Sequence, residues 1–198
     1  ATAVRRAIRR SCGLSCGIKW PNDLVLSGRK VCGILTEALP GPEGSLWVIV
    51  GIGINVFRPE VDRPVLGRNV PEYMAELVPA PESEPGHFVS LAQAIAALPE
   101  REQAARREEV ITDIQREVIA RILVNYGRWR ELGFMPTLGS YEGSSFLTGR
   151  AVRIEDAAGT ATLEGTATGV DERGRLLVRT ADETVPVASG EAHVMVMP

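Results

Sequence analysis

The segment from Gly17 to Ile54 constrains the fold more than any other, because short apolar runs alternate there with turn-forming residues. Strands are expected at residues 17–20, 24–26, 31–39 and 46–54, separated by turns at 21–23, 27–30 and 40–44. Parallel neighbours need a crossover of about a dozen residues or more, which none of these turns provides. The pattern therefore predicts an antiparallel meander rather than a β-α-β unit. The last strand, Leu46–Ile54, is apolar throughout, and we expect it to be buried.

Two segments have the periodicity of amphipathic helices. In the first, Val4 and Ile8 share one face until Gly13 ends the helix, and a helix entered so late indicates that the chain starts inside a domain. The second runs from Pro99 to Leu132 as one long helix with a charged, solvated outer face. Its apolar stripe comprises Val110, Ile114, Val118, Ile122 and Tyr126, widened by Ile111, Ile119 and Leu123.

Prolines dominate the segment between the meander and the long helix. They stand at positions 59, 64, 71, 79, 81 and 85. Because proline fixes φ and removes a backbone donor, long regular elements are not expected here. We expect a surface loop with short helical pieces from Phe57 to Pro85.

After Gly133 the pattern changes to short strands at intervals of about ten residues. Strands are expected at 151–154, 160–168, 176–179 and 185–187, with turns at 156–159, 171–174 and 181–183. This spacing is typical of a small β-barrel. The sequence therefore predicts an α+β domain over residues 1–142 and a small barrel over residues 143–198.

Composition excludes several classes of protein. Of 198 residues, 44% are hydrophobic and 24% charged, which is ordinary for a folded chain. A net charge of −3 argues against nucleic-acid binding through charge alone, and the longest apolar run, Leu46–Ile54, is too short to span a membrane. The cysteines are too few for a disulfide scaffold, and neither histidine lies near a cysteine pair. We therefore expect no metal site, and we expect Cys12, Cys16 and Cys32 to be small buried hydrophobes in a reducing cytoplasm.

The first candidate site is the block Lys19-Trp20-Pro21-Asn22-Asp23. A lysine at the end of a strand, just before a proline-stiffened turn, is held on a rigid element from which a compact positive charge can be aimed. The alternative is that Lys19 is a solvated edge lysine and that Asn22 and Asp23 merely close the turn. Spacing alone leaves both interpretations open.

The second candidate is the strand Gly51-Ile52-Gly53-Ile54-Asn55. Its alternate glycines are not a dinucleotide fingerprint, because Val56 occupies the position of the third glycine and no helix pattern follows. Glycine at alternate positions removes the side chains from one face of a strand, so a flat ligand can lie against the backbone. Close packing of the strand on a helix is the alternative.

Together these blocks resemble those of the biotin protein ligase family. The family's Lys-Trp-Pro-Asn-Asp block is intact at 19–23, its Lys-x-x-Gly-Ile-Leu-x-Glu block stands at 30–37, and its Gly-x-Gly-Ile-Asn strand stands at 51–55. Order and spacing fit over essentially the whole chain. The resemblance implies a class II synthetase-like catalytic domain, seen in part, with an antiparallel or mixed sheet and helices. It also implies that the C-terminal barrel is SH3-like.

The activity that the resemblance implies has two steps: biotin and Mg·ATP give biotinyl-5′-AMP, and a lysine of a biotin carboxyl carrier protein then takes the biotin. Lys19 matches the catalytic lysine, which also contacts biotin. The remaining biotin-side positions are Gly33, Leu35, Gly51, Gly53 and Ile54. Asn55 matches the asparagine near the ATP phosphates and magnesium. The resemblance also allows a homodimer.

Some parts of the family pattern are missing. Neither the Gly-Arg-Gly-Arg-x-x-Arg loop nor the serine/threonine segment for the biotin ring occurs, and both would precede Ala1. Met195 falls about where some members carry an arginine that reaches toward ATP. A non-catalytic fragment or carrier-docking remnant is therefore one alternative, and a lipoate ligase-like enzyme is another. The intact block at 19–23 with an appended barrel favours biotin.

Overall fold

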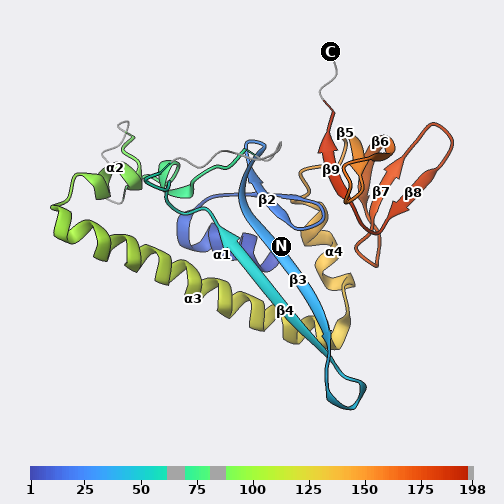
Figure 1. Ribbon diagram of the computed structural model, residues 1–198, viewed down its shortest axis with the longest axis horizontal. Coiled ribbons are helices and arrows are strands. Elements are labelled where there is room, and N and C mark those ends of the chain that lie inside the picture. The colour runs from blue at the N-terminus through green and yellow to red at the C-terminus, as the bar shows by residue number, and fades with distance from the viewer. Residues whose placement is uncertain (62–69, 81–87, 196–198) are drawn as a thin grey trace.

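Residues 1–61, 70–80 and 88–195 are described by the computed structural model. The first sheet consists of β1 (Gly17–Lys19), β2 (Asp23–Leu26), β3 (Arg29–Pro40) and β4 (Leu46–Ile54). The strands pair in the order β1-β2-β3-β4, each antiparallel to the next (Figure 1). The predicted meander is confirmed. Short local turns determine this topology, because no connection here is long enough to cross over the sheet.

Two tight turns fix the ends of these strands. Between β2 and β3, Ser27 and Gly28 have φ of 49° and 81°, the positive pair that a two-residue hairpin requires. Between β1 and β2, the Trp20–Pro21 peptide bond is cis. Asn22 ties this turn to β3: its side-chain amide donates to the Ile34 carbonyl at 2.8 Å, and the Ile34 N–H donates to the Asn22 carbonyl at 3.0 Å.

The two predicted helices are α1 (Thr2–Cys12) and α3 (Glu100–Leu132). Helix α1 ends at Gly13, which has a φ of 71°, and it packs against both α3 and β1. Ile114 and Val118 of α3 are buried. The apolar stripe of α3 is wider than the face that its neighbours cover, since Ile119, Leu123 and Tyr126 are exposed.

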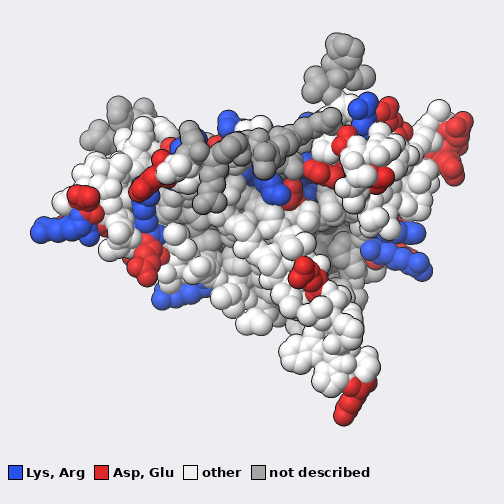
Figure 2. Space-filling view, viewed as in Figure 1, with Lys and Arg blue, Asp and Glu red and all other residues white. Residues whose placement is uncertain are grey.

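The expectation that Leu46–Ile54 is a buried strand is wrong for most of its length. The exposed apolar side chains of β3 and β4 are Leu35, Leu39, Leu46, Trp47, Val48, Ile49 and Val50. Because side chains alternate between faces along a strand, both faces of the outer hairpin are open. Figures 1 and 2 show this hairpin extending from the body with few charged side chains. The core lies instead under β1, β2 and the start of β3, and among the described residues none covers the outer hairpin.

The second sheet, which we call the C-terminal sheet, spans residues 151–194. It consists of β5 (Ala151–Glu155), β6 (Ala161–Val170), β7 (Leu176–Arg179), β8 (Thr184–Val187) and β9 (Glu191–Val194). Its strands pair antiparallel in the order β8-β7-β6-β5-β9. Four of these strands match the predicted ones. Strand β9 was not predicted, because Glu-Ala-His-Val is too short and polar to stand out as a strand.

Helices α2 (Leu91–Ala96) and α4 (Met135–Glu142) were also missed. Ser90 and Gln93 form a capping box at the start of α2. Helix α4 is hard to predict from the sequence because it contains Pro136 and Gly139, two residue types that disfavour helices. In its described part, the proline-rich loop is irregular apart from the short helical turn Met74–Glu76, as predicted. Pro64, Pro81 and Pro85 lie outside the described residues. In the described ranges, no helix is both long and apolar enough to cross a bilayer.

Two glycine substitutions test the packing of the C-terminal sheet. A Cβ at Gly165 would lie 2.5 Å from the Arg179 carbonyl oxygen, so Gly165→Ala should destabilise the protein by about 1–3 kcal/mol. The matched control is Gly127→Ala on exposed α3, where a Cβ meets nothing within 4 Å and helix propensity should add about 1 kcal/mol of stability. Urea unfolding followed by circular dichroism measures both. Equal stability of Gly165→Ala and the parent would contradict the predicted close contact.

Candidate functional site

Lys19 ends β1, directly opposite Asp23 on β2. Its residue exposure is only 9%, so the alternative of a solvated edge lysine is wrong. The Lys30 amine pairs with Asp23 at 2.7 Å between Nζ and Oδ1. Lys19 and Lys30 are the only two lysines in the sequence, which has twenty arginines, and the fold brings both to the same place. No role was predicted for Lys30, although it begins the block at 30–37.

The C-terminal sheet packs against one side of the block at 19–23. The Trp20 indole N–H donates to the Gly174 carbonyl, in the turn between β6 and β7, at 3.0 Å. Glu191 of β9 brings its Oε1 to 3.7 Å from the Lys19 Nζ. Within β1, the Ile18 N–H donates at 2.7 Å to the carbonyl of Ser144, in the segment that leads into the C-terminal sheet. The block at 19–23 is therefore held from both sheets, a contact that sequence reasoning missed because its partners are more than 120 residues apart.

A cavity of about 300 Å³ lies at this junction. Its walls are Lys19, Trp20, Pro21, Asn22, Asp23, Lys30, Gly190 and Glu191. A second cavity of about 220 Å³ shares both lysines and reaches His193 and Phe146. Two amines and two carboxylates line the junction, so an anionic group entering it would meet two ammonium groups on a rigid strand and turn.

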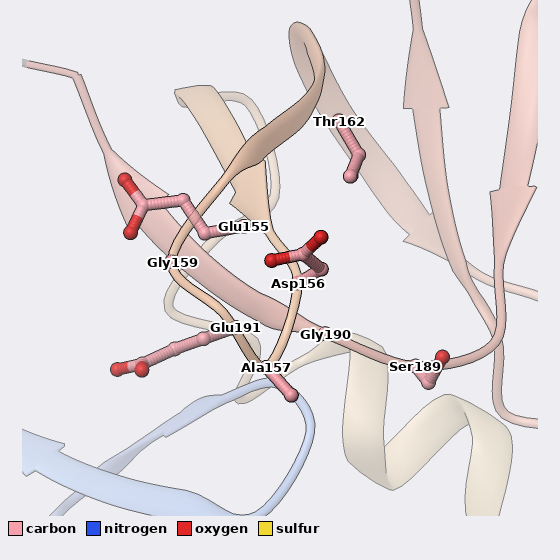
Figure 3. Close-up of a pocket in the computed structure, with 8 residues that line it drawn as sticks. All are labelled: Glu155, Asp156, Ala157, Gly159, Thr162, Ser189, Gly190 and Glu191. Atoms are coloured by element: carbon pink, nitrogen blue, oxygen red, sulfur yellow. The ribbon is translucent and has the colours of Figure 1, made fainter.

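A larger cavity of about 600 Å³ lies on the C-terminal sheet (Figure 3). It carries the carboxylates of Glu155, Asp156 and Glu191 and no cationic side chain. Gly190 and Glu191 line both this cavity and the junction cavity. The junction cavity is the better candidate site for an anionic ligand, because Lys19 and Lys30 line it, whereas the charged residues that line the larger cavity are all acidic.

The predicted glycine strand, residues 51–55, is the C-terminal end of β4 together with Asn55. Gly53 stands opposite Gly33, and Gly51 stands opposite Leu35. Among the described atoms, a Cβ at Gly53 would meet only the Gly33 carbonyl oxygen, at 4.0 Å. On the face where Gly51 and Gly53 would carry a Cβ, no described helix atom lies within 4 Å, so that alternative is wrong for the described residues. Gly51 and Gly53 instead present bare backbone beside Gly33, and we call these three residues the glycine patch.

Lys30 and Asn55 border the glycine patch. A Cβ at Gly33 would lie 3.0 Å from the Lys30 Nζ, so the lysine side chain folds over Gly33. The Asn55 side-chain amide donates to the Lys30 carbonyl at 3.0 Å, and the Asn55 N–H donates to the Val31 carbonyl at 2.8 Å. Of the predicted site residues, Lys19 lines the junction cavity, whereas the other six do not: Gly33, Leu35, Gly51, Gly53, Ile54 and Asn55.

No group of three or more His, Cys, Asp and Glu side chains in the described part of the chain is placed to hold a metal ion. The cysteines fit the expected role as small hydrophobes: Cys16 and Cys32 are buried and Cys12 is half-buried. Burial raises the pKa of the Cys16 thiol to about 12 and that of Cys32 to about 11. His87 lies outside the described residues.

Comparison with solved structures identifies the fold. The structure superposes on the biotin protein ligase of Aquifex aeolicus with a TM-score of 0.68 at 22% identity, covering 98% of this chain and 70% of that one. An Aquifex aeolicus biotin protein ligase in complex with biotin and ATP gives a TM-score of 0.64 at 21% identity, covering 98% and 67%. The chain thus has a biotin protein ligase-like fold of mixed helices and antiparallel sheets.

Sequence comparisons give the family. Residues 1–55 match the Biotin/lipoate A/B protein ligase family, and residues 147–194 match the Biotin protein ligase C terminal domain. The Biotin--[acetyl-CoA-carboxylase] ligase of Mycobacterium tuberculosis is 30% identical over 176 residues, covering 88% of this chain and 52% of the relative. The Bifunctional ligase/repressor BirA of Bacillus subtilis is 27% identical over 194 residues, covering 98% and 51%.

The chain belongs to the biotin protein ligase family. It spans about half the length of the curated relatives that it matches. The segment matched at 1–55 contains the glycine patch and the residues of the junction cavity from Lys19 to Lys30. The segment matched at 147–194 contains Glu191 and His193.

The buried thiols predict a loss of stability at alkaline pH. In the unfolded chain a thiol ionises near pH 8.5, whereas Cys16 and Cys32 stay protonated in the native state to about pH 11–12. The native state therefore binds more protons above pH 8.5, so stability is full below that pH and falls as pH rises. Between pH 7.5 and 9.5 the loss should be about 1.4 kcal/mol per thiol.

Urea unfolding at the two pH values measures this loss. The control is the Cys16→Ala/Cys32→Ala double variant, whose stability should change much less over the same interval. An equal loss in parent and double variant would show that the thiols are not its source.

Proposed function

We propose that this chain forms part of a biotin protein ligase that makes biotinyl-5′-AMP from biotin and ATP and transfers biotin to a lysine of a biotin carboxyl carrier protein. The observation that carries the proposal is Lys19, buried at a charged junction inside a segment that matches the ligase family. Two curated relatives are named for biotin--[acetyl-CoA-carboxylase] ligation, and one similar structure is titled as a complex with biotin and ATP.

The first chemical step brings two anions together. An oxygen of the biotin carboxylate attacks the α-phosphorus of ATP, a new P–O bond forms, and the bond to pyrophosphate breaks. Repulsion between carboxylate and phosphate opposes this approach, and negative charge accumulates around phosphorus. A preorganised ammonium group in a poorly solvated place stabilises that charge more than water does. Lys19 supplies this group, and Lys30 adds a second positive charge in the same cavity.

The glycine patch is proposed as the floor for biotin and the adenylate. Gly33, Gly51 and Gly53 present backbone without side chains, so a flat group can approach closely. Leu35, which is 61% exposed, offers apolar contact beside this floor. Ile54 continues the floor along β4 through its backbone, because its side chain packs against the core on the opposite face. Backbone amides and an apolar side chain together suit a small ligand that is mostly apolar with a few polar atoms.

Asn55 is proposed to contact the ATP phosphates and the Mg²⁺ that accompanies them. Mg²⁺ on a nucleotide takes most of its ligands from phosphate and water, so a single amide oxygen is a sufficient protein contribution. The Asn55 amide nitrogen is held by the Lys30 carbonyl, which leaves the oxygen as the ligand atom that this side chain can offer. The metal would supply further neutralisation of phosphate charge. The resemblance also supports a cytoplasmic location and a homodimer.

The two-domain division supports the same proposal. We assign residues 1–142 to a class II synthetase-like catalytic domain and residues 143–198 to an SH3-like C-terminal domain. The contacts of Trp20 with Gly174 and of Lys19 with Glu191 run between these parts, so the second domain completes the charged junction. A lipoate ligase is less well supported, because the C-terminal match at 147–194 is to biotin protein ligases.

Replacing Lys19 tests the catalytic assignment. If the amine neutralises charge in the transition state, Lys19→Ala should lower the rate of biotin-dependent pyrophosphate release by roughly a hundredfold, which corresponds to about 3 kcal/mol. Lys19→Arg should restore activity only in part, because a planar guanidinium does not replace a compact ammonium in a small cavity. The assay uses the complete product of the gene with biotin, ATP and Mg²⁺.

Circular dichroism and thermal unfolding confirm that each variant is folded. Near-normal pyrophosphate release by folded Lys19→Ala would remove Lys19 from the mechanism. A parent protein that releases no pyrophosphate in response to biotin would contradict the proposed function itself.

A further inference from the structure

Two glutamates face each other on the C-terminal sheet. Glu155 of β5 and Glu191 of β9 are directly opposed register partners, so their side chains leave the same face of the sheet. Figure 3 shows both side chains extending to the same side, away from the carboxylate of Asp156. Like charges at directly opposed positions destabilise a strand pair. The arrangement therefore needs a group that offsets the repulsion.

His193 is one such group. Its Nε2 lies 3.3 Å from the Glu155 Oε2 and 3.9 Å from the Glu191 Oε2. The side chains of His193 and Glu155 are 13% and 15% exposed, whereas that of Glu191 is 48% exposed. An imidazole Nε2 that carries hydrogen can donate toward one carboxylate while attracting the other. His193, itself in contact with half-buried Glu155, thus restrains one carboxylate oxygen of the more exposed Glu191.

The held glutamate reaches the candidate catalytic amine. Glu191 turns Oε2 toward His193 and Oε1 toward the Lys19 Nζ, 3.7 Å away. The contacts run in sequence from Glu155 through His193 and Glu191 to Lys19, crossing from the C-terminal sheet to β1. Lys19 itself is at the junction cavity, whose wall includes Gly190 and Glu191.

We propose that His193, supported by Glu155, is a positioning residue that acts through Glu191 to hold the Lys19 amine in place. The importance of this placement for catalysis rests on the proposed ligase function, but the placement itself does not. Holding Glu191 sets both the direction of the ammonium group and its accessibility from the cavity. Without His193, Glu191 is repelled by Glu155 and leaves Lys19 less confined.

The same sheet provides a matched control. Arg153 is the register partner of His193 on β5, and its guanidinium pairs with Glu164 at 2.6 Å between Nε and Oε1. Removing Arg153 takes away a charged side chain from the same face of the same strand pair. The ion pair that this change breaks, between Arg153 and Glu164, involves none of the residues that lead to Lys19.

The chain's lysine content makes a direct measurement possible. Because Lys19 and Lys30 are the only lysines, pulse acetylation with dilute acetic anhydride followed by peptide mass spectrometry reports each amine separately. A buried amine paired with a carboxylate acylates slowly, since reaction needs an exposed, neutral nitrogen. His193→Ala should therefore speed acetylation of Lys19 by roughly fivefold and leave Lys30 unchanged. Arg153→Ala should change neither rate.

A double-mutant cycle tests whether His193 acts through Glu191. Glu191→Gln alone should speed acetylation of Lys19, and adding His193→Ala to it should give no further increase. The inference is overturned if His193→Ala raises the Lys19 rate by the same factor in both backgrounds. It is also overturned if Lys30 accelerates equally, or if Arg153→Ala has the same effect as His193→Ala.

Catalysis gives a second readout. In the complete gene product, His193→Ala should lower kcat for biotin-dependent pyrophosphate release by roughly fivefold, with no further loss in the Glu191→Gln background. His193→Gln, which retains an N–H donor, should recover most of the rate. If the acetylation cycle holds but the parent releases no pyrophosphate, the proposed function fails and the positioning stands. If the parent is active but the cycle is additive, the positioning fails alone.

Discussion

The hydrogen bond from the Trp20 indole to the Gly174 carbonyl, 3.0 Å long, is the contact on which the candidate site depends. It joins the turn after β1 to the C-terminal sheet, and Trp20 itself is 4% exposed. A buried indole N–H without its acceptor is costly, so the turn and the sheet stabilise each other. With the sheet docked in this way, Gly190 and Glu191 become a wall of the junction cavity and Glu191 reaches Lys19.

The other half of the site is rigid for a different reason. Asn22 exchanges two hydrogen bonds with Ile34, and Asp23 pairs with Lys30, so the β1–β2 turn is bound to β3 along its length. Charged groups placed on such a framework need little reorganisation when a charged ligand arrives, which is what electrostatic catalysis requires. The pairing of each lysine with a carboxylate also explains how two amines can lie in one small cavity.

The parts of this arrangement that the sequence predicted are those determined locally. Turn residues fixed the meander, glycine at position 13 ended α1, and the block at 19–23 pointed to Lys19. The exposure of Leu46–Val50 was not predictable, because an apolar strand looks the same whether or not another element covers it. Nor were the roles of Glu191 and His193, whose partners lie far away in sequence and depend on how two sheets dock.

Hydrogen exchange of Trp20→Phe tests most directly the claim that docking of the C-terminal sheet holds the turn at 19–23. The substitution removes the indole N–H and keeps an aromatic ring. We predict that the amides of Ile18, which donates to Ser144, and Phe146, which donates to Ile18, exchange about tenfold faster. The amide of Val118 in α3 should keep its parent rate. Unchanged exchange at Ile18 and Phe146 would contradict the account, because β1 would then stay bound to the segment that leads into the C-terminal sheet without the Trp20–Gly174 hydrogen bond.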